Sequence, residues 1–161
     1  ELMADEITEL LGLVKASNSN VQGKFSQDLK NNFQKINDAF YTTMLKVTAG
    51  TGGLPAFRVV YITSLGTALA ASNANPTHMG RVVGMTAEVI NEGETGLVRR
   101  IGRIENEFWN LTPGMPYFLG EGGEIINTVP LSGFIQYVGV AESVHVLAFN
   151  LGIPIKILGD L

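Results

Sequence analysis

The sequence has no cysteine among its 161 residues and only two histidines. The missing thiols exclude a disulfide scaffold, a metal site built on paired cysteines and a cysteine nucleophile. No apolar run approaches the roughly 20 residues that a membrane helix needs, so we expect no membrane insertion. Charged residues are also few, at 16%, and their formal net charge is −4. Because a nucleic-acid-binding protein needs a basic surface, we expect no nucleic-acid partner.

Glycine and proline are distributed unevenly, and this divides the chain into three segments. Residues 1–47 hold only two of the 19 glycines and none of the six prolines, whereas residues 48–55 are rich in glycine. Residues 56–161 contain short apolar runs separated by turn residues, which is typical of an antiparallel β-sandwich or barrel. We therefore predict a helical oligomerisation arm at 1–47, a flexible hinge at 48–55 and a β-rich head domain at 56–161, which together make an α+β fold.

Apolar residues in the predicted arm recur every 11 residues, which corresponds to three turns of a nearly straight helix. Because residues 17–20 and Gly23 are poor helix formers, the arm is either one long helix or a helix pair. Its apolar stripe would pack on the chain's own β domain or on other copies, and its large area favours self-association. The residues expected at this interface are Met3, Ile7, Val14, Val21, Phe25, Leu29, Phe33, Ile36, Phe40 and Val47.

Side chains that could support catalysis or bind a metal do not cluster in the sequence. His78 lies beside a turn and His145 in a predicted strand, and neither has a second histidine or a carboxylate cluster at ligand spacing. The Gly-rich run at 50–53 lacks the lysine of a phosphate-binding loop, and the run at 120–123 includes Glu121, which would repel an anion. We therefore predict no catalytic residue, no metal site and no cofactor.

The C-terminal half carries an ordered series of turn motifs. The first is Trp-Asn-Leu-Thr-Pro-Gly-Met-Pro-Tyr-Phe-Leu-Gly at 109–120, and the second is Val-Pro-Leu-Ser-Gly-Phe at 129–134. Over residues 57–158 this order resembles a module of tailed-bacteriophage virion appendages, which include tail fibres, tailspikes, head fibres and decoration proteins. The motif residues, which we expect to be scaffold rather than ligand-binding residues, are Trp109, Pro113, Gly114, Gly120, Pro130 and Gly133.

The resemblance implies a homotrimer whose parallel arms form a coiled-coil bundle. It further implies a structural virion protein, a fibre or decoration component that is assembled in the host cytoplasm and docks on other virion proteins of the capsid or tail. We expect no enzymatic activity, because tailspike depolymerases place their chemistry in long β-helix segments that this sequence lacks. Contact with host-surface glycans is a further expectation, with no residue assigned to it. The alternative is a carbohydrate-binding or accessory β module outside a virion.

Overall fold

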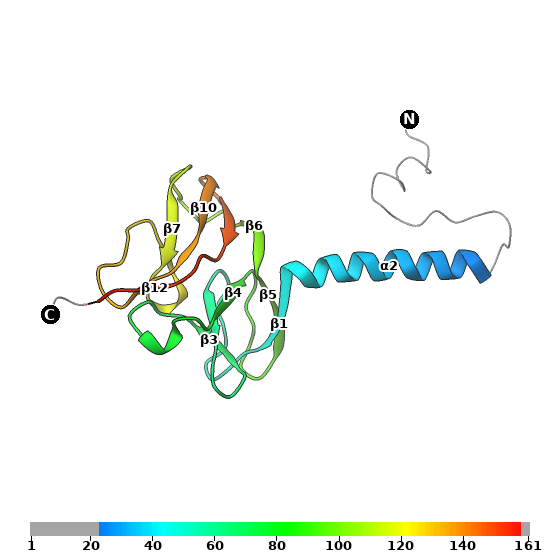
Figure 1. Cartoon of the computed structure of the whole chain (residues 1–161), viewed down its shortest axis with the longest axis horizontal. Helices are drawn as coiled ribbons and strands as arrows, with labels where there is room; N and C mark the ends of the chain where they lie inside the picture. Colours follow the sequence, from blue (N-terminus) through cyan, green and yellow to red (C-terminus); the bar gives the residue numbers. More distant parts are fainter. Residues whose placement is uncertain (1–22, 159–161) are drawn as a thin grey trace. The chain divides into compact units, whose positions relative to one another are not determined.

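The computed structural model describes residues 23–158 (Figure 1). The chain divides into two compact units, with the boundary between Thr42 and Thr43. The first unit contains helix α2 (Gly23–Thr43) except for its last residue, and α2 is the one α-helix among the described residues. The second unit is a β domain that begins at Thr43.

Helix α2 has an apolar face that is open to solvent. Leu29, Phe33 and Ile36 follow one another at intervals of four and three residues, so they lie on the same side of the helix. Their exposed fractions are 43%, 62% and 54%. On another face, the Nε2 atom of Gln27 donates a hydrogen bond to Oδ1 of Asn31 at 3.0 Å, one turn further along the helix.

The predicted α+β fold, with a long helix or helix pair over residues 1–47 in a trimeric coiled-coil bundle, is wrong. The described structure is mainly antiparallel β sheet. Helix α2 ends at Thr43, and the next five residues form strand β1 (Met44–Thr48). Val47, predicted to lie on the helical stripe, is instead 4% exposed in the core of the β domain. The apolar residues of this segment match both an 11-residue repeat and a strand pattern, and pairing with strand β5 decides between them.

The segment predicted to be a flexible hinge belongs to the β domain. The amide of Gly50 donates to the carbonyl of Ala68 at 2.8 Å. Leu54 and Ile90 exchange two backbone hydrogen bonds, at 2.8 and 2.9 Å, and Leu54 is only 1% exposed. Residues 48–55 are therefore held by backbone pairing and by burial, despite their glycine content.

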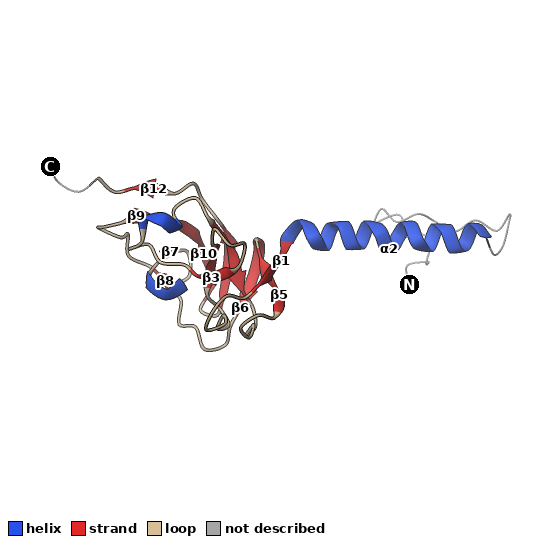
Figure 2. Ribbon diagram, turned by 90° about the horizontal axis from the view of Figure 1, so that it is seen from below, coloured by secondary structure: helices blue, strands red, loops and turns tan. Residues whose placement is uncertain are grey.

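Two five-stranded sheets make up most of the β domain (Figures 1 and 2). In spatial order, the first sheet contains β1, β5 (Thr95–Arg99), β4 (Val82–Thr86), β2 (Val59–Ile62) and β3 (Ala68–Ala70). The second contains β6 (Ile101–Glu105), β11 (Val146–Asn150), β10 (Tyr137–Ser143), β7 (Pro116–Leu119) and β8 (Ile125–Ile126). The remaining elements are the strand pair β9 (Phe134–Ile135) and β12 (Ile155–Lys156), and the 3₁₀ helices η1 (Pro76–His78) and η2 (Glu121–Gly123). All pairings between these strands are antiparallel, as expected from the turn spacing beyond residue 56.

Both sheets contribute to one main core. Val59 of β2 and Met85 of β4 share it with Leu119 of β7 and Leu147 of β11. A smaller cluster lies on the other face of the first sheet and includes Val60, the neighbour of Val59. Successive side chains of a strand point to opposite faces, so β2 is buried on both sides and its sequence is nearly continuously apolar.

Two of the motif residues, Pro113 and Gly114, form a turn directly before strand β7. The amide of Met115 donates to the carbonyl of Thr112 at 3.1 Å, with Pro113 and Gly114 between them. Gly114 has φ +78°, which is the conformation that the third residue of a type II turn requires. Pro113 supplies the restricted φ of the preceding position.

The backbone of Asn73 lies against two further motif glycines, Gly120 and Gly133. Its amide donates to the carbonyl of Gly120 at 3.2 Å, and its carbonyl accepts from the amide of Phe134 at 3.1 Å. Gly133 has φ +75°, and a Cβ atom there would lie 2.1 Å from the carbonyl oxygen of Asn73. Only glycine allows this close approach, which places Phe134 beside the 72–75 turn.

Candidate functional site: a mixed aromatic and polar pocket

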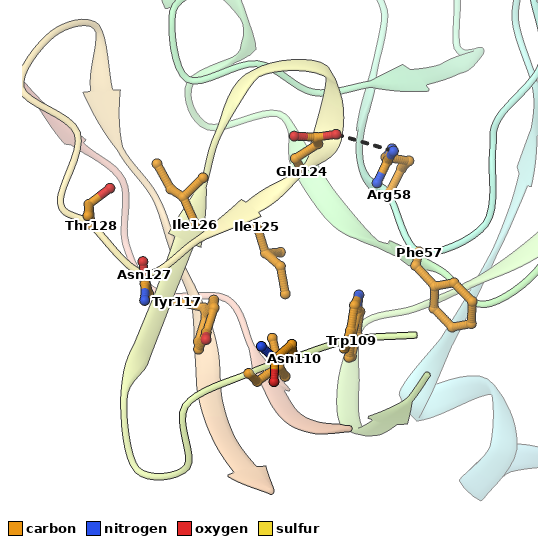
Figure 3. A pocket seen from close by; sticks show the side chains of 11 residues that line it. Phe57, Arg58, Trp109, Asn110, Tyr117, Glu124, Ile125, Ile126, Asn127 and Thr128 are labelled. Carbon is orange, nitrogen blue, oxygen red and sulfur yellow. Dashed lines mark ion pairs between the residues drawn. The ribbon is translucent and has the colours of Figure 1, made fainter. Parts of the chain in front are cut away.

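An open pocket of about 450 Å³ lies on the β domain. Its volume is within the range of about 300–1,000 Å³ that is common for ligand sites. Four segments form it: residues 57–58 before β2, residues 109–111 after β6, Tyr117 on β7, and residues 124–128 from the end of η2 through β8 (Figure 3). These segments come from both sheets, so the pocket exists only when the two sheets are assembled.

Trp109 is the largest side chain of the pocket, and its loop is fixed at several points. Its backbone amide donates to the carbonyl of Asn106 at 3.1 Å, and its carbonyl accepts from Nδ1 of His145 at 2.8 Å. Two residues later, the amide of Leu111 donates to the carbonyl of Val144 at 2.8 Å. The indole is half-buried and packs against the main core, and it also lines the pocket.

Phe57 contacts Trp109 from a strained backbone position. The two ring centroids are 5.5 Å apart with an edge-to-face angle of 65°. Figure 3 shows Trp109 between Phe57 on one side and Ile125, Asn110 and Tyr117 on the other. Phe57 has φ +57°, and it is the one residue other than glycine with a positive φ in the described chain. Such a conformation in a bulky residue costs about 1–3 kcal/mol and persists only where its surroundings enforce it.

Hydrogen bonds to Thr86 hold the backbone around Phe57 in place. Its side chain is completely buried, and Oγ1 donates to the carbonyl of Pro55 at 2.7 Å while accepting from the amide of Arg58 at 2.9 Å. Its carbonyl accepts from the amide of Phe57 at 3.0 Å, and its amide donates to the carbonyl of Arg58 at 2.9 Å. Thr86 therefore holds the backbone of Pro55, Phe57 and Arg58, and this positions the last two residues in the pocket.

The rim of the pocket is polar. Nη2 of Arg58 lies 3.3 Å from Oε1 of Glu124, as the dashed line in Figure 3 shows. The side chains of Asn110, Asn127 and Thr128 are exposed, and none has a hydrogen-bond partner within the described residues. The rim thus combines one neutralised charge pair with amide and hydroxyl groups that remain available to a ligand.

His78 has a structural environment outside this pocket. It is 8% exposed, and its ring stacks on Tyr61 with the centroids 3.7 Å apart. Its Nδ1 atom accepts a hydrogen bond from the amide of Ser72 at 3.0 Å. Burial, aided by the positive charge of Arg81, lowers the pKa of His78 below 6.5. The neutral imidazole therefore serves as a hydrogen-bond acceptor for the 72–75 turn.

Among the residues predicted for self-association, only those on α2 can be placed on a helix. Leu29, Phe33 and Ile36 share its exposed face. The backbones of Phe25 and Phe40 also lie in α2, although their side chains are outside the described part. Met3, Ile7, Val14 and Val21 lie outside the described residues.

Sequence reasoning identified one pocket residue, Trp109, and assigned it to the scaffold. It missed Arg58, Asn127 and Thr128, which are ordinary loop residues in the sequence. The one local pattern that could have indicated Arg58 is the apolar run at 57–62, which this arginine interrupts directly after Phe57. Within residues 23–158, no group of three or more histidine, aspartate or glutamate side chains could hold a metal ion.

The described residues contain no helix that is both long and apolar enough to span a membrane. No protein-family model and no curated protein sequence matches this chain.

Proposed function

We propose that this chain is a structural protein of a tailed-bacteriophage virion, a homotrimeric fibre or decoration component that docks on the capsid or tail. The motif order over residues 57–158 motivates this assignment, together with a β domain stabilised by tight turns. The proposal places the protein in the virion, assembled in the host cytoplasm, with a structural rather than an enzymatic role.

The observation that carries the proposal is the exposed apolar face of α2. Leu29, Phe33 and Ile36 are all at least 43% exposed and lie within two turns of each other. Most helical stability in proteins comes from packing of an apolar face rather than from the intrinsic helix propensity of the residues. Self-association that covers this face would remove the exposed apolar area and stabilise the helix.

The experiment is sedimentation velocity of the full chain and of Ile36→Asp. We expect the wild-type protein to sediment as a trimer and the variant to dissociate, because a buried carboxylate without a partner is strongly unfavourable. Asn31→Asp is the matched control. It adds the same charge to α2 about 140° away from Ile36 by helix geometry and keeps an acceptor for Gln27, so it should remain trimeric.

Far-UV circular dichroism should retain the β signal of both variants. A monomeric wild-type protein, or an Ile36→Asp variant that stays assembled, would refute self-association through this face of α2.

A further inference from the structure

We propose that the pocket lined by Trp109, Arg58 and Asn127 binds a neutral saccharide. This inference concerns the β domain, whereas the proposed self-association concerns α2, so either can fail without the other. Four properties of the pocket suit such a ligand: an accessible indole, polar groups without internal partners, a neutralised charge pair and a fixed geometry.

The indole of Trp109 suits the apolar face of a pyranose ring. It is only half-buried, although the surrounding loop is tied to the core. Phe57 occupies one side of the ring, and the other side faces the pocket with Asn110 and Tyr117 (Figure 3). Its Nε1–H has no acceptor within the described residues, so it can donate to a hydroxyl at the ring edge. An amphipathic ligand fits both properties of this side chain.

The free polar groups match hydroxyls rather than a single strong charge. A sugar hydroxyl both donates and accepts, and so do the amides of Asn110 and Asn127 and the hydroxyl of Thr128. All three side chains are exposed, and they are drawn around the pocket in Figure 3. They have no internal partner to lose, so hydrogen bonds to a ligand would replace only bonds to water.

The charge balance favours a neutral ligand over an anionic one. Arg58 is the one cation that lines the pocket, and the carboxylate of Glu124 lies 3.3 Å from its guanidinium. An anionic sugar would have to displace this carboxylate or lie beside it, and the chain has a formal net charge of −4. A neutral sugar can instead accept from Arg58 and donate to Glu124 with the ion pair intact.

Hydrogen bonds within the chain fix the geometry of the pocket. Thr86 holds the backbone of Phe57 and Arg58, and His145 with Asn106 holds that of Trp109. A fixed site reduces the entropy lost on binding, which matters for ligands with few apolar contacts. The positive φ of Phe57 keeps its ring against Trp109, and this is where the loop stores its strain.

Intrinsic fluorescence can test the proposal directly, because Trp109 is the only tryptophan in the chain. The full chain is titrated with cellobiose, lactose and diacetylchitobiose as neutral probes and with sialyllactose as the anionic probe. We expect a saturable change in emission with at least one neutral probe, with a Kd of about 1 mM, which is typical of weak single-site binding. Saturation-transfer NMR should show ring protons of that sugar in contact with the protein.

Two variants and a matched control locate the site. Asn127→Ala and Arg58→Ala should each raise the Kd about fivefold, the effect of losing one hydrogen bond. Asn150→Ala removes an exposed asparagine outside the pocket and should change the Kd by less than about twofold. No response to any neutral probe at about 50 mM, well above the expected Kd, would overturn the proposal. Tighter binding of sialyllactose, or equal effects of Asn127→Ala and Asn150→Ala, would also overturn it.

Discussion

The Gly133→Ala variant tests the close approach between Gly133 and the backbone of Asn73. The new Cβ atom would lie 2.1 Å from the carbonyl oxygen of Asn73, and the residue has φ +75°. The backbone must therefore shift, and this shift weakens the hydrogen bond from the amide of Phe134 to the same carbonyl. Phe134 is 1% exposed, so its displacement also disturbs the main core.

The magnitude follows from three contributions. An alanine in the left-handed region costs about 1–2 kcal/mol. The weakened hydrogen bond costs about 1 kcal/mol, and forced displacement in a well-packed core costs about 1–3 kcal/mol. We expect Gly133→Ala to lower the free energy of unfolding by about 3–6 kcal/mol, which is a large part of the 5–15 kcal/mol typical of a folded domain.

Gly114→Ala is the matched control. Gly114 also has a positive φ, of +78°, but a Cβ atom there would have no neighbour within 4 Å. It should lose only the conformational contribution of about 1–2 kcal/mol. Urea unfolding of both full-length variants, followed by Trp109 fluorescence and circular dichroism at one protein concentration, measures the difference. Equal destabilisation of the two variants would refute the argument that close packing at Asn73 requires glycine at 133.

Two further predictions concern strain and protonation. In urea unfolding, the Phe57→Gly variant should be about 1 kcal/mol more stable than the Phe57→Ala variant, because φ is +57° at this position. This is the reverse of the order usual at other positions. A Phe57→Ala variant that is the more stable of the two would contradict strain at this site. Because the folded pKa of His78 lies below the unfolded value of 6.5, unfolded chains bind the proton more readily. The resulting stability is complete above pH 6.5 and falls as the pH drops through 6.5 toward the folded pKa. The stability difference between wild type and His78→Phe, which retains a ring for Tyr61, should change between about pH 8 and pH 5 in favour of the variant. A constant difference would contradict this reasoning.

The N-terminal region shows why a periodic pattern was insufficient to predict the fold. Val47, which lies in β1, fits the 11-residue repeat of the predicted helix. In the same five residues, Lys46 is exposed beside the buried Val47, which is a strand pattern. Short segments of this kind are compatible with both structures, and pairing with β5 determined the outcome. Val47 therefore contributes to the core of the β domain, although local sequence assigned it to a helix.

Turn residues were more informative than the apolar rows. Thr112 to Met115 form the predicted turn because proline and glycine restrict or extend the local backbone regardless of distant residues. The glycines at 50–53 were misleading for the opposite reason. Their local flexibility is overridden by backbone pairing with Ala68 and by the burial of Leu54, neither of which is visible in a local pattern.

The sequence by itself excluded a disulfide scaffold and cysteine-based sites, and it determined the turns and the antiparallel character of the strands beyond residue 56. These properties depend on side-chain type and short-range geometry. Tertiary structure alone decided where α2 ends, which strands pair, and that Arg58 and Trp109 line one pocket with Asn127. These three residues come from separate loops, and no local pattern relates them. Only the assembly of two sheets around a common core, with Thr86 and Asn73 connecting distant backbone segments, brings such residues together.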